Sequence, residues 1–344
     1  SRRTSAGSAR RSGHVEPMYR NPLCVIVVIA GLSACNRAPV EPLAVSVPSA
    51  IVERRDGPSA EELSRETQVV VLGTGTPIPD ARRAGPSIAV IHRGEAYLFD
   101  VGAGAVRNAA VARYRYDIPS LYPTQICCVF LTHLHNDHTQ DLSELATSMW
   151  WRRQRQLRVW GPPGLVALVS GITQMMAPDL AIRLSGTQPI EHRDGYRIEP
   201  IEIEPGVVFT KDDLTIEAFN VSHGDVAPAF GFRITTDDKT VVISGDTAYN
   251  ETLLEMARGV DILIHEVISD TGLLRNSESF QAYHRRSHTP ASELARLATE
   301  ARPDILVLYH GLFYGVAESV LVDEVTAGYD GETVLANDLD LFWD

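Results

Sequence analysis

Short apolar runs rich in β-branched residues alternate with helical patterns from Gln68 to the end of the chain. This alternation predicts an α/β architecture in which helices cover sheets. Strands are predicted at 69–72, 87–91, 96–99, 126–131, 214–219, 230–234, 240–244, 261–264 and 305–308. No internal repeat or second linker interrupts this part, so residues 67–344 are expected to form one domain.

Two segments have the spacing of amphipathic helices. Apolar residues recur three and four positions apart from Leu142 to Trp150 and again from Leu294 to Ala301, which is the period of a helix with one buried face. Thr289 is predicted to cap the second helix, with Pro290 as its first residue.

The N-terminal segment has the parts of a secretory signal. Ten apolar residues run from Leu23 to Leu32, after the basic Arg20 and before small residues. The run is too short to cross a bilayer and predicts a signal peptide, with a buried strand as the alternative. Its ending, 32–35, resembles the lipobox of bacterial lipoproteins, which implies cleavage before Cys35 and lipid on its sulfur. Residues 1–34 are therefore expected to be signal peptide and upstream sequence.

The segment 35–66 carries four prolines among charged residues, which disfavours regular structure. It is expected to be a tether that could hold the folded part up to roughly 90 Å from a membrane, at about 3 Å per residue. The resemblance to lipoproteins implies a periplasmic protein anchored to a membrane through lipidated Cys35. Asn36 stands where such proteins carry Asp for inner-membrane retention, which favours the outer membrane.

Composition narrows the choice of function. The 344 residues carry a formal charge of −13, and residues 1–34 hold five Arg against one Glu, which leaves −17 on the rest. With only two Lys in the chain, bulk nucleic-acid binding is not expected. Four Cys exclude a disulfide scaffold. Cys127 and Cys128 are expected to pack as small strand residues, in preference to a vicinal disulfide or a thiol site.

A dense group of potential metal ligands follows the predicted strand 126–131. His133, His135, Asp137 and His138 occupy six consecutive positions. Residues two apart in an extended chain point the same way, so His133 and His135 can bind one metal while Asp137 and His138 face a second. Imidazole and carboxylate together suit two divalent ions, Zn²⁺ first, with Mn²⁺ or Fe²⁺ as alternatives. The alternative is a polar loop over a strand end.

This run resembles the HxHxDH signature of the metallo-β-lactamase fold, which implies a four-layer αββα sandwich. The resemblance also implies the full ligand set, in which one site has His133, His135 and His223, the other has Asp137, His138 and His310, and Asp246 bridges them. Taken singly, His223 and His310 would be read as capped-loop or core histidines. Their order along the chain and their places after predicted strands favour the ligand role.

Within this superfamily the chain resembles the ribonuclease Z branch from Val69 to about Tyr314. The motifs that carry the likeness are 73–77 (GTGTP), 99–102 (FDVG), 160–164 (WGPPG), 265–266 (HE) and 288–290 (HTP). Asp141 replaces the usual Gly, and Tyr309 replaces the usual Thr before the ligand His310. The long arm that grips tRNA in the common bacterial enzymes is missing, because only residues 235–239 separate the strands that would flank it.

The resemblance implies a hydrolytic mechanism. Two divalent ions can share a bridging hydroxide that attacks the substrate, with Asp137 as ligand and orienting group. His288 is the candidate general acid and Glu266 would hold its tautomer, whereas a surface salt bridge is the other reading of that pair. His265 is expected to be structural.

The preferred hypothesis is a hydrolase of a small anionic ester, which could be a phosphodiester, a cyclic nucleotide or an aryl sulfate. A ribonuclease Z-type endoribonuclease comes second. A lactonase or β-lactamase comes third, because two-zinc β-lactamases have Cys where Asp246 stands. A metal-binding lipoprotein without catalysis is the alternative from another class, and a homodimer is left open.

Overall fold

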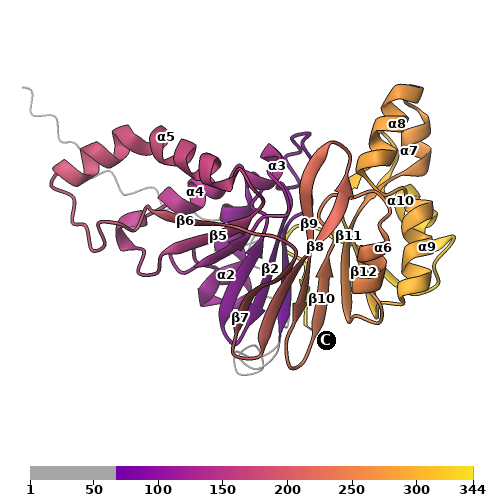
Figure 1. Ribbon diagram of the computed structural model, residues 1–344, viewed down its shortest axis with the longest axis horizontal. Coiled ribbons are helices and arrows are strands. Elements are labelled where there is room, and N and C mark those ends of the chain that lie inside the picture. Colours follow the sequence, from indigo (N-terminus) through magenta and orange to yellow (C-terminus); the bar gives the residue numbers. More distant parts are fainter. Residues whose placement is uncertain (1–66, 344) are drawn as a thin grey trace, which may run out of the picture. The chain divides into compact units, whose positions relative to one another are not determined.

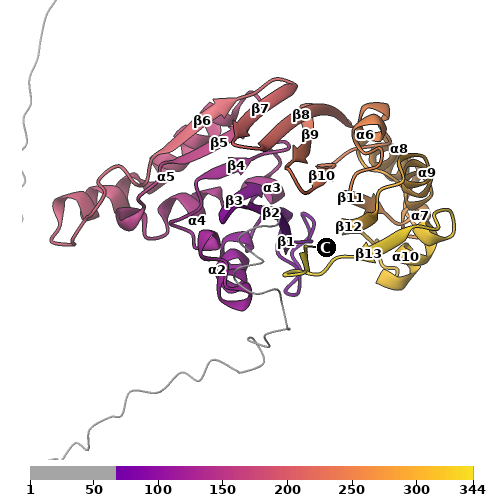
Figure 2. The same cartoon turned by 90° about the horizontal axis from the view of Figure 1, so that it is seen from below.

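Two seven-stranded mixed sheets pack face to face, with helices on both outer faces (Figures 1 and 2). The structure is a computed structural model and describes residues 67–343. The predicted signal peptide, Cys35 and the tether lie outside the described residues. The layers follow the order helix, sheet, sheet, helix, so the predicted αββα sandwich is confirmed.

The first sheet comes from the N-terminal half and one terminal strand, in the order β14-β1-β2-β3-β4-β5-β6. Its strands are β1 (Gln68–Gly73), β2 (Ser87–His92), β3 (Glu95–Phe99), β4 (Cys128–Phe130), β5 (Leu157–Gly161), β6 (Ile198–Glu202) and β14 (Leu341–Phe342). The helices of this half are α2 (Ala105–Tyr116), α3 (Asn136–Thr139), α4 (Leu142–Thr147) and α5 (Leu165–Ser185), with 3₁₀ turns η2 (Pro119–Leu121) and η3 (Trp150–Arg152). Apolar residues of α2, α4 and α5 cover its outer face.

The second sheet has the order β13-β12-β11-β10-β9-β8-β7. Its strands are β7 (Gly206–Lys211), β8 (Leu214–His223), β9 (Val226–Thr235), β10 (Thr240–Ile243), β11 (Ile262–Ile268), β12 (Ile305–Leu312) and β13 (Glu332–Leu335). The helices that follow them are α6 (Glu251–Met256), α7 (Asp270–Leu274), α8 (Glu278–Ser287), α9 (Ala291–Ala301) and α10 (Glu318–Thr326). Apolar residues of α6, α9 and α10 cover the outer face.

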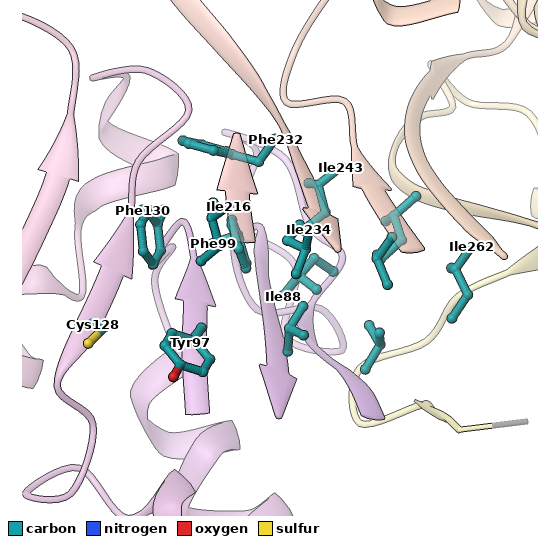
Figure 3. Packing of buried hydrophobic residues seen from close by; sticks show 14 of the residues in the cluster. Ile88, Tyr97, Phe99, Cys128, Phe130, Ile216, Phe232, Ile234, Ile243 and Ile262 are labelled. Atoms are coloured by element: carbon teal, nitrogen blue, oxygen red, sulfur yellow. The ribbon is translucent and has the colours of Figure 1, made fainter. Parts of the chain in front are cut away.

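Aromatic and β-branched aliphatic residues fill the space between the two sheets (Figure 3). Phe99 and Phe130 of the first sheet meet Phe232 of the second, with ring centroids 5.4 Å and 5.9 Å apart. Phe130 also stacks on Trp160 at 4.7 Å. These large buried rings set the distance between the two sheets. They thereby also set the relative positions of the strand ends from which the site is built.

Two helix predictions need correction. The helix expected from Leu142 to Trp150 ends at Thr147, because the backbone of Ser148 is extended (ψ 112°). Met149 then adopts a left-handed conformation (φ 51°) before the separate turn η3 begins at Trp150. Thr289 does not cap α9, where Pro290 is the N-cap residue. The hydroxyl of Thr289 instead donates to the Thr247 carbonyl, 2.6 Å away. The Thr289 side chain therefore makes a tertiary hydrogen bond in place of the helix cap that the local sequence predicted.

The longest helix, α5, was not predicted. Its apolar residues are spread around the helix and not gathered on one face, so it lacks the periodicity that reveals an amphipathic helix. Asp179 and Arg183 pair with each other, 2.8 Å apart, on the side of this helix. The helix α5 is long and apolar enough to cross a membrane, as are some core helices of soluble proteins.

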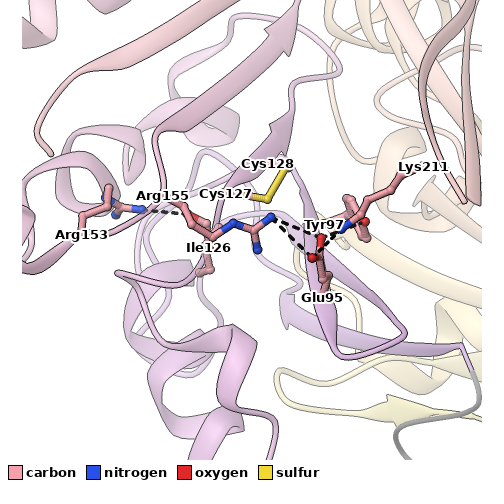
Figure 4. Close-up of a disulfide and its surroundings, with 8 residues drawn as sticks. All are labelled: Glu95, Tyr97, Ile126, Cys127, Cys128, Arg153, Arg155 and Lys211. Atoms are coloured by element: carbon pink, nitrogen blue, oxygen red, sulfur yellow. Dashed lines mark hydrogen bonds and ion pairs between the residues drawn. A yellow bond between two sulfur atoms is a disulfide. The ribbon is translucent and has the colours of Figure 1, made fainter. Parts of the chain in front are cut away.

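The vicinal cysteines also differ from expectation. Cys127 and Cys128 are buried as predicted, but the structure joins them in a disulfide (Figure 4). Beside it, Glu95 accepts a hydrogen bond from the Tyr97 hydroxyl and forms ion pairs with Arg155 and Lys211. The preference for two separate thiols was therefore wrong, because the sulfur of Cys127, just before β4, is bonded to that of Cys128, the first residue of the strand.

Candidate metal centre

Every predicted ligand lies at the same edge of the sandwich, where strands of both sheets end. His133 and His135 lie in the loop after β4, and Asp137 and His138 lie in the short helix α3 that follows. From the second sheet come His223, Asp246 and His310: the first ends β8, the second follows β10, and the third lies in β12. The structure thus brings together all seven residues.

His310 enters the site through an irregularity in β12. The pairing with β11 passes from Glu266↔Tyr309 to Val267↔Gly311, so His310 is left without a partner and has φ 47°. A bulge of this kind turns a side chain that strict alternation would send to the opposite face. The strand was predicted to end at Leu308, whereas it continues through the bulge to Leu312.

The first donor set consists of three histidines. His135 Nδ1 lies 2.9 Å from His133 Nε2 and 3.2 Å from His223 Nε2. Asp246 Oδ2 lies 3.9 Å from each of the two Nε2 atoms. His135 is partly exposed and the other three residues are buried, so this set opens to solvent on the side of His135.

The second donor set is built around Asp137, His138 and His310. Asp137 Oδ2 lies 3.5 Å from His138 Nε2 and 3.4 Å from His310 Nε2. The other oxygen of Asp246, Oδ1, lies 3.4 Å and 3.6 Å from the same two nitrogens. Asp246 therefore presents one oxygen to each donor set.

The donor atoms fit two metal ions. Two ligands about 2.1 Å from a tetrahedral ion lie roughly 3.4 Å apart, which is close to the separations within each set. Among the described residues, His138 Nε2 and Asp246 Oδ1 are buried without a hydrogen-bond partner. Such atoms are costly to bury unless a ligand satisfies them, so both sets are suited to divalent metals.

Outer contacts orient the imidazoles toward the centre. Asp100, in a left-handed conformation after β3, accepts hydrogen bonds from His138 Nδ1, Thr132 N and Thr132 Oγ1, each at 2.8 Å. His223 Nδ1 donates to the Ser287 carbonyl at 2.8 Å. With Nδ1 occupied, Nε2 of each ring is left for a metal.

Burial and neighbouring charges shift the pKa values of His133 and Asp246 in the directions that favour metal binding, whereas Asp246 and Asp100 raise the pKa of His138. Burial lowers the pKa of His133 well below its usual value, and the neighbouring imidazoles act in the same direction. Burial alone would raise the pKa of Asp246, but His310 and His138 hold it well below its usual value. A neutral imidazole and an ionised carboxylate are the protonation states that bind metal.

His288 and Glu266 form a pair next to the two donor sets. The His288 ring lies 5.2 Å from His223 and 6.1 Å from His310, so it adjoins both sets. Its Nδ1 lies 3.4 Å from Glu266 Oε2, and Oε1 accepts from Thr289 N at 2.9 Å. Burial favours the neutral ring, but the Glu266 carboxylate outweighs it and raises the pKa of His288. Both residues are buried, so this pair is not a surface salt bridge.

Three further residues were assigned no role at the centre by sequence reasoning. Asp100 orients His138, the hydroxyl of Thr132 lies 3.0 Å from His133 Nδ1, and the carbonyl of Ser287 orients His223. Asp100 belongs to the motif 99–102, which the sequence analysis identified. Its role depends on a left-handed backbone conformation, which the hydrophobic pattern of the sequence does not reveal.

Asp141, the departure from the family motif, accepts hydrogen bonds from Gly104 N and Val106 N at the start of α2. His265 is buried outside the donor sets, and its Nδ1 donates to the Glu266 carbonyl.

Comparison with known proteins agrees with this architecture. Residues 96–311 match the beta-lactamase superfamily domain. Ribonuclease Z from Mycobacterium sp. (strain KMS) is 33% identical over 251 residues, which cover 71% of this chain and 84% of that protein. The metallo-beta-lactamase fold protein YhfI from Bacillus subtilis has a TM-score of 0.62 at 20% identity, covering 81% of this chain and all of that one. For human tRNase Z, short form, the TM-score is 0.57 at 22% identity, with 80% and 98% covered. The chain therefore belongs to the beta-lactamase superfamily and is a metallo-β-lactamase-fold hydrolase related to ribonuclease Z.

Proposed function

We propose that this hydrolase cleaves phosphodiester bonds in small anionic esters and that it uses two divalent ions, Zn²⁺ first and Mn²⁺ or Fe²⁺ as alternatives. The observation that carries the proposal is Asp246, whose two oxygens face two separate donor sets beneath a histidine with a raised pKa. Two bound divalent ions supply Lewis acidity and lower the pKa of bound water.

The protein's own groups would supply the proton transfer. In the overall reaction, water adds to phosphorus, the bond to the leaving oxygen breaks, and a monoester and an alcohol or phenol are released. His288 donates a proton to the leaving oxygen and regains one from the attacking water. Glu266 is a positioning residue that keeps Nδ1 of His288 protonated and the opposite nitrogen directed at substrate. Asp137 orients the attacking water beside the second donor set.

The relatives favour a phosphodiester over the other esters considered. Ribonuclease Z, by its name, acts on the phosphodiester bonds of RNA, and the alignment covers most of that protein. Asp246 occupies the place at which two-zinc β-lactamases carry Cys, which disfavours β-lactam hydrolysis. Aryl sulfates are retained as test substrates, because the same centre would stabilise the negative charge that develops when a sulfate ester is hydrolysed.

A second candidate is endonucleolytic processing of tRNA 3′ ends, favoured by the ribonuclease Z relatives. Against it, β9 and β10 pair directly from Thr235↔Thr240 through the short loop 236–239. That hairpin leaves no room for a tRNA-gripping arm between these two strands. The acidic charge of the chain also disfavours a large polyanion.

The test is a substrate panel with purified, metal-loaded protein. It includes a bis-aryl phosphate, a cyclic nucleotide, an aryl sulfate, a lactone, a β-lactam and a precursor tRNA. The proposal expects the highest kcat/KM on one of the two small phosphodiesters. Highest activity on precursor tRNA would replace it with the second candidate, and activity confined to lactone or β-lactam would overturn both.

A further inference from the structure

A row of aromatic rings continues outward from His288 along α8. The His284 ring stacks 5.7 Å from His288, and the Phe280 ring lies 3.9 Å from His284. Tyr314, from the segment after β12, completes the group at 5.1 Å from Phe280 and 5.3 Å from His284. We call Phe280, His284 and Tyr314 the aromatic wall. Phe280 and Tyr314 are only partly buried, so ring surface is accessible to a ligand.

The backbone holds Tyr314 in an unfavourable conformation. Its φ is 45°, a conformation that is energetically costly for a residue with a bulky side chain. Backbone conformations of this kind cluster at functional sites. The neighbouring helix α7 packs so closely that a Cβ on Gly272 would lie 2.2 Å from the Phe313 carbonyl oxygen. Arg275 of the next turn donates to the Gly315 carbonyl at 2.8 Å. Contacts to the residues on both sides therefore hold the backbone that carries Tyr314.

Tyr314 also lines a cavity of about 220 Å³, bounded by residues 74–83 and 311–315. Ile78, 66% exposed, and the Phe313 ring give this cavity apolar walls. Its two cations are already paired, Arg83 with Glu318 at 2.8 Å and Arg82 with Asp80 at 2.9 Å. A flat uncharged ring suits this space better than a second anionic group would.

We propose that the aromatic wall and this cavity form the leaving-group subsite, and that the substrate is an ester whose leaving group carries a flat aromatic or heteroaromatic ring. The inference rests on the proposed function, because the leaving oxygen must lie beside His288 and the wall begins at that residue. Tyr314 is the central residue of the subsite. Its hydroxyl has no hydrogen-bond partner among residues 67–343, so stacking and a hydrogen bond are both open to it.

The test compares two phosphodiesters whose leaving groups are equally acidic, one phenolic and one a fluorinated alcohol. Removing the ring with Tyr314→Leu should lower kcat/KM for the aryl ester by about 5- to 100-fold, the range expected for loss of one stacked ring. The fluoroalkyl ester should lose less than about 2-fold. Tyr314→Phe should retain the aryl preference, and Tyr114→Leu on α2, an exposed tyrosine away from the site, should change neither rate. Equal losses on both esters, or none, would overturn the subsite.

Binding measurements separate this inference from the proposed function. Calorimetry with phenyl phosphate and methyl phosphate should show tighter binding of the phenyl compound, and Tyr314→Leu should remove that difference. A wild-type protein that binds phenyl phosphate preferentially but cleaves no phosphodiester would contradict the proposed function and leave the subsite intact. Equal affinity for the two monoesters would refute the subsite whatever the enzyme cleaves.

Discussion

At the scale of single residues, Asp246 is the side chain on which both donor sets depend. We expect Asp246→Ala to lose both ions, because each set loses an oxygen and the positive charge of the ions is no longer balanced. Metal analysis of purified protein should fall from two ions per chain to none. Asp330→Ala, an exposed acid paired with Arg302, is the control that should retain both. Full metal content in Asp246→Ala would contradict the shared-ligand geometry.

Asp100 tests the outer contacts of the same centre. Asp100→Asn keeps the shape but weakens the hydrogen bonds that fix His138 and Thr132. Loss of such a partner typically costs 10- to 100-fold in metal affinity. Competition with a chelator should show that decrease, and the second ion should dissociate first because His138 belongs to its donor set. Unchanged affinity for both ions would show that Asp100 serves packing alone.

His288 separates proton transfer from metal binding. His288→Ala should keep both ions and lose about 10² to 10⁴ in rate on an alkyl phosphodiester, but much less on a p-nitrophenyl ester, because nitrophenolate departs without a proton. An acid is active only while protonated. The wild-type rate on the alkyl ester should therefore fall as pH rises through the raised pKa of His288, and the variant should lack that decline. Equal losses on both esters would indicate charge stabilisation instead of acid catalysis.

At the scale of elements, the loops that contain Gly85 and Gly102 pack closely against each other and against the backbone of Asp137. A Cβ on Gly102 would lie 2.3 Å from the Gly85 carbonyl carbon and 2.4 Å from the Asp137 carbonyl oxygen. Gly102→Ala should therefore lower the free energy of unfolding by about 1–3 kcal/mol. Gly171→Ala in α5 is the matched substitution, since a Cβ there meets nothing within 4 Å, and it should raise stability by about 0.5–1 kcal/mol. Denaturant titration measures both, and a destabilised Gly171→Ala would contradict the helix.

The sequence predicted strands better than helices, for a physical reason. Buried strands such as 69–72 are visible in the sequence as short apolar runs. The strands β5, β6, β7, β13 and β14 were not predicted, and the last four of these are largely half-buried or exposed. The apolar residues of α5 are not gathered on one face, so periodicity could not reveal it, and the extended backbone of Ser148 that ends α4 leaves no trace in the hydrophobic pattern. In the site, the identity of the metal ligands was predictable from the HxHxDH motif and from the order of the other ligands along the chain. The bulge at His310 and the hydrogen bonds of Asp100 arise from pairing between distant strands, which no local pattern contains.

At the scale of the whole molecule, attachment to a membrane stays a prediction from residues 23–35. In cells that produce the full chain, Cys35→Ser should move the protein from the membrane fraction to the soluble fraction without loss of hydrolytic activity, because the lipid would be attached at that sulfur. Cys24→Ser, within the predicted signal peptide, should leave fractionation unchanged. A wild-type protein found soluble with residues 19–34 retained would exclude the lipoprotein assignment.

The shared edge of the two sheets has a mechanical consequence. Each donor set draws residues from both halves of the chain, with His133, His135, Asp137 and His138 from the first and His223, Asp246 and His310 from the second. Bound ions would therefore link the two sheets, in addition to the apolar side chains packed between them and to polar contacts such as Glu95 with Lys211 and His92 with Asp213. Each tenfold rise in free ion above its dissociation constant adds about 1.4 kcal/mol to the free energy of unfolding. In a metal-poor compartment the enzyme would thus lose stability as well as activity, and chelation should lower its melting temperature.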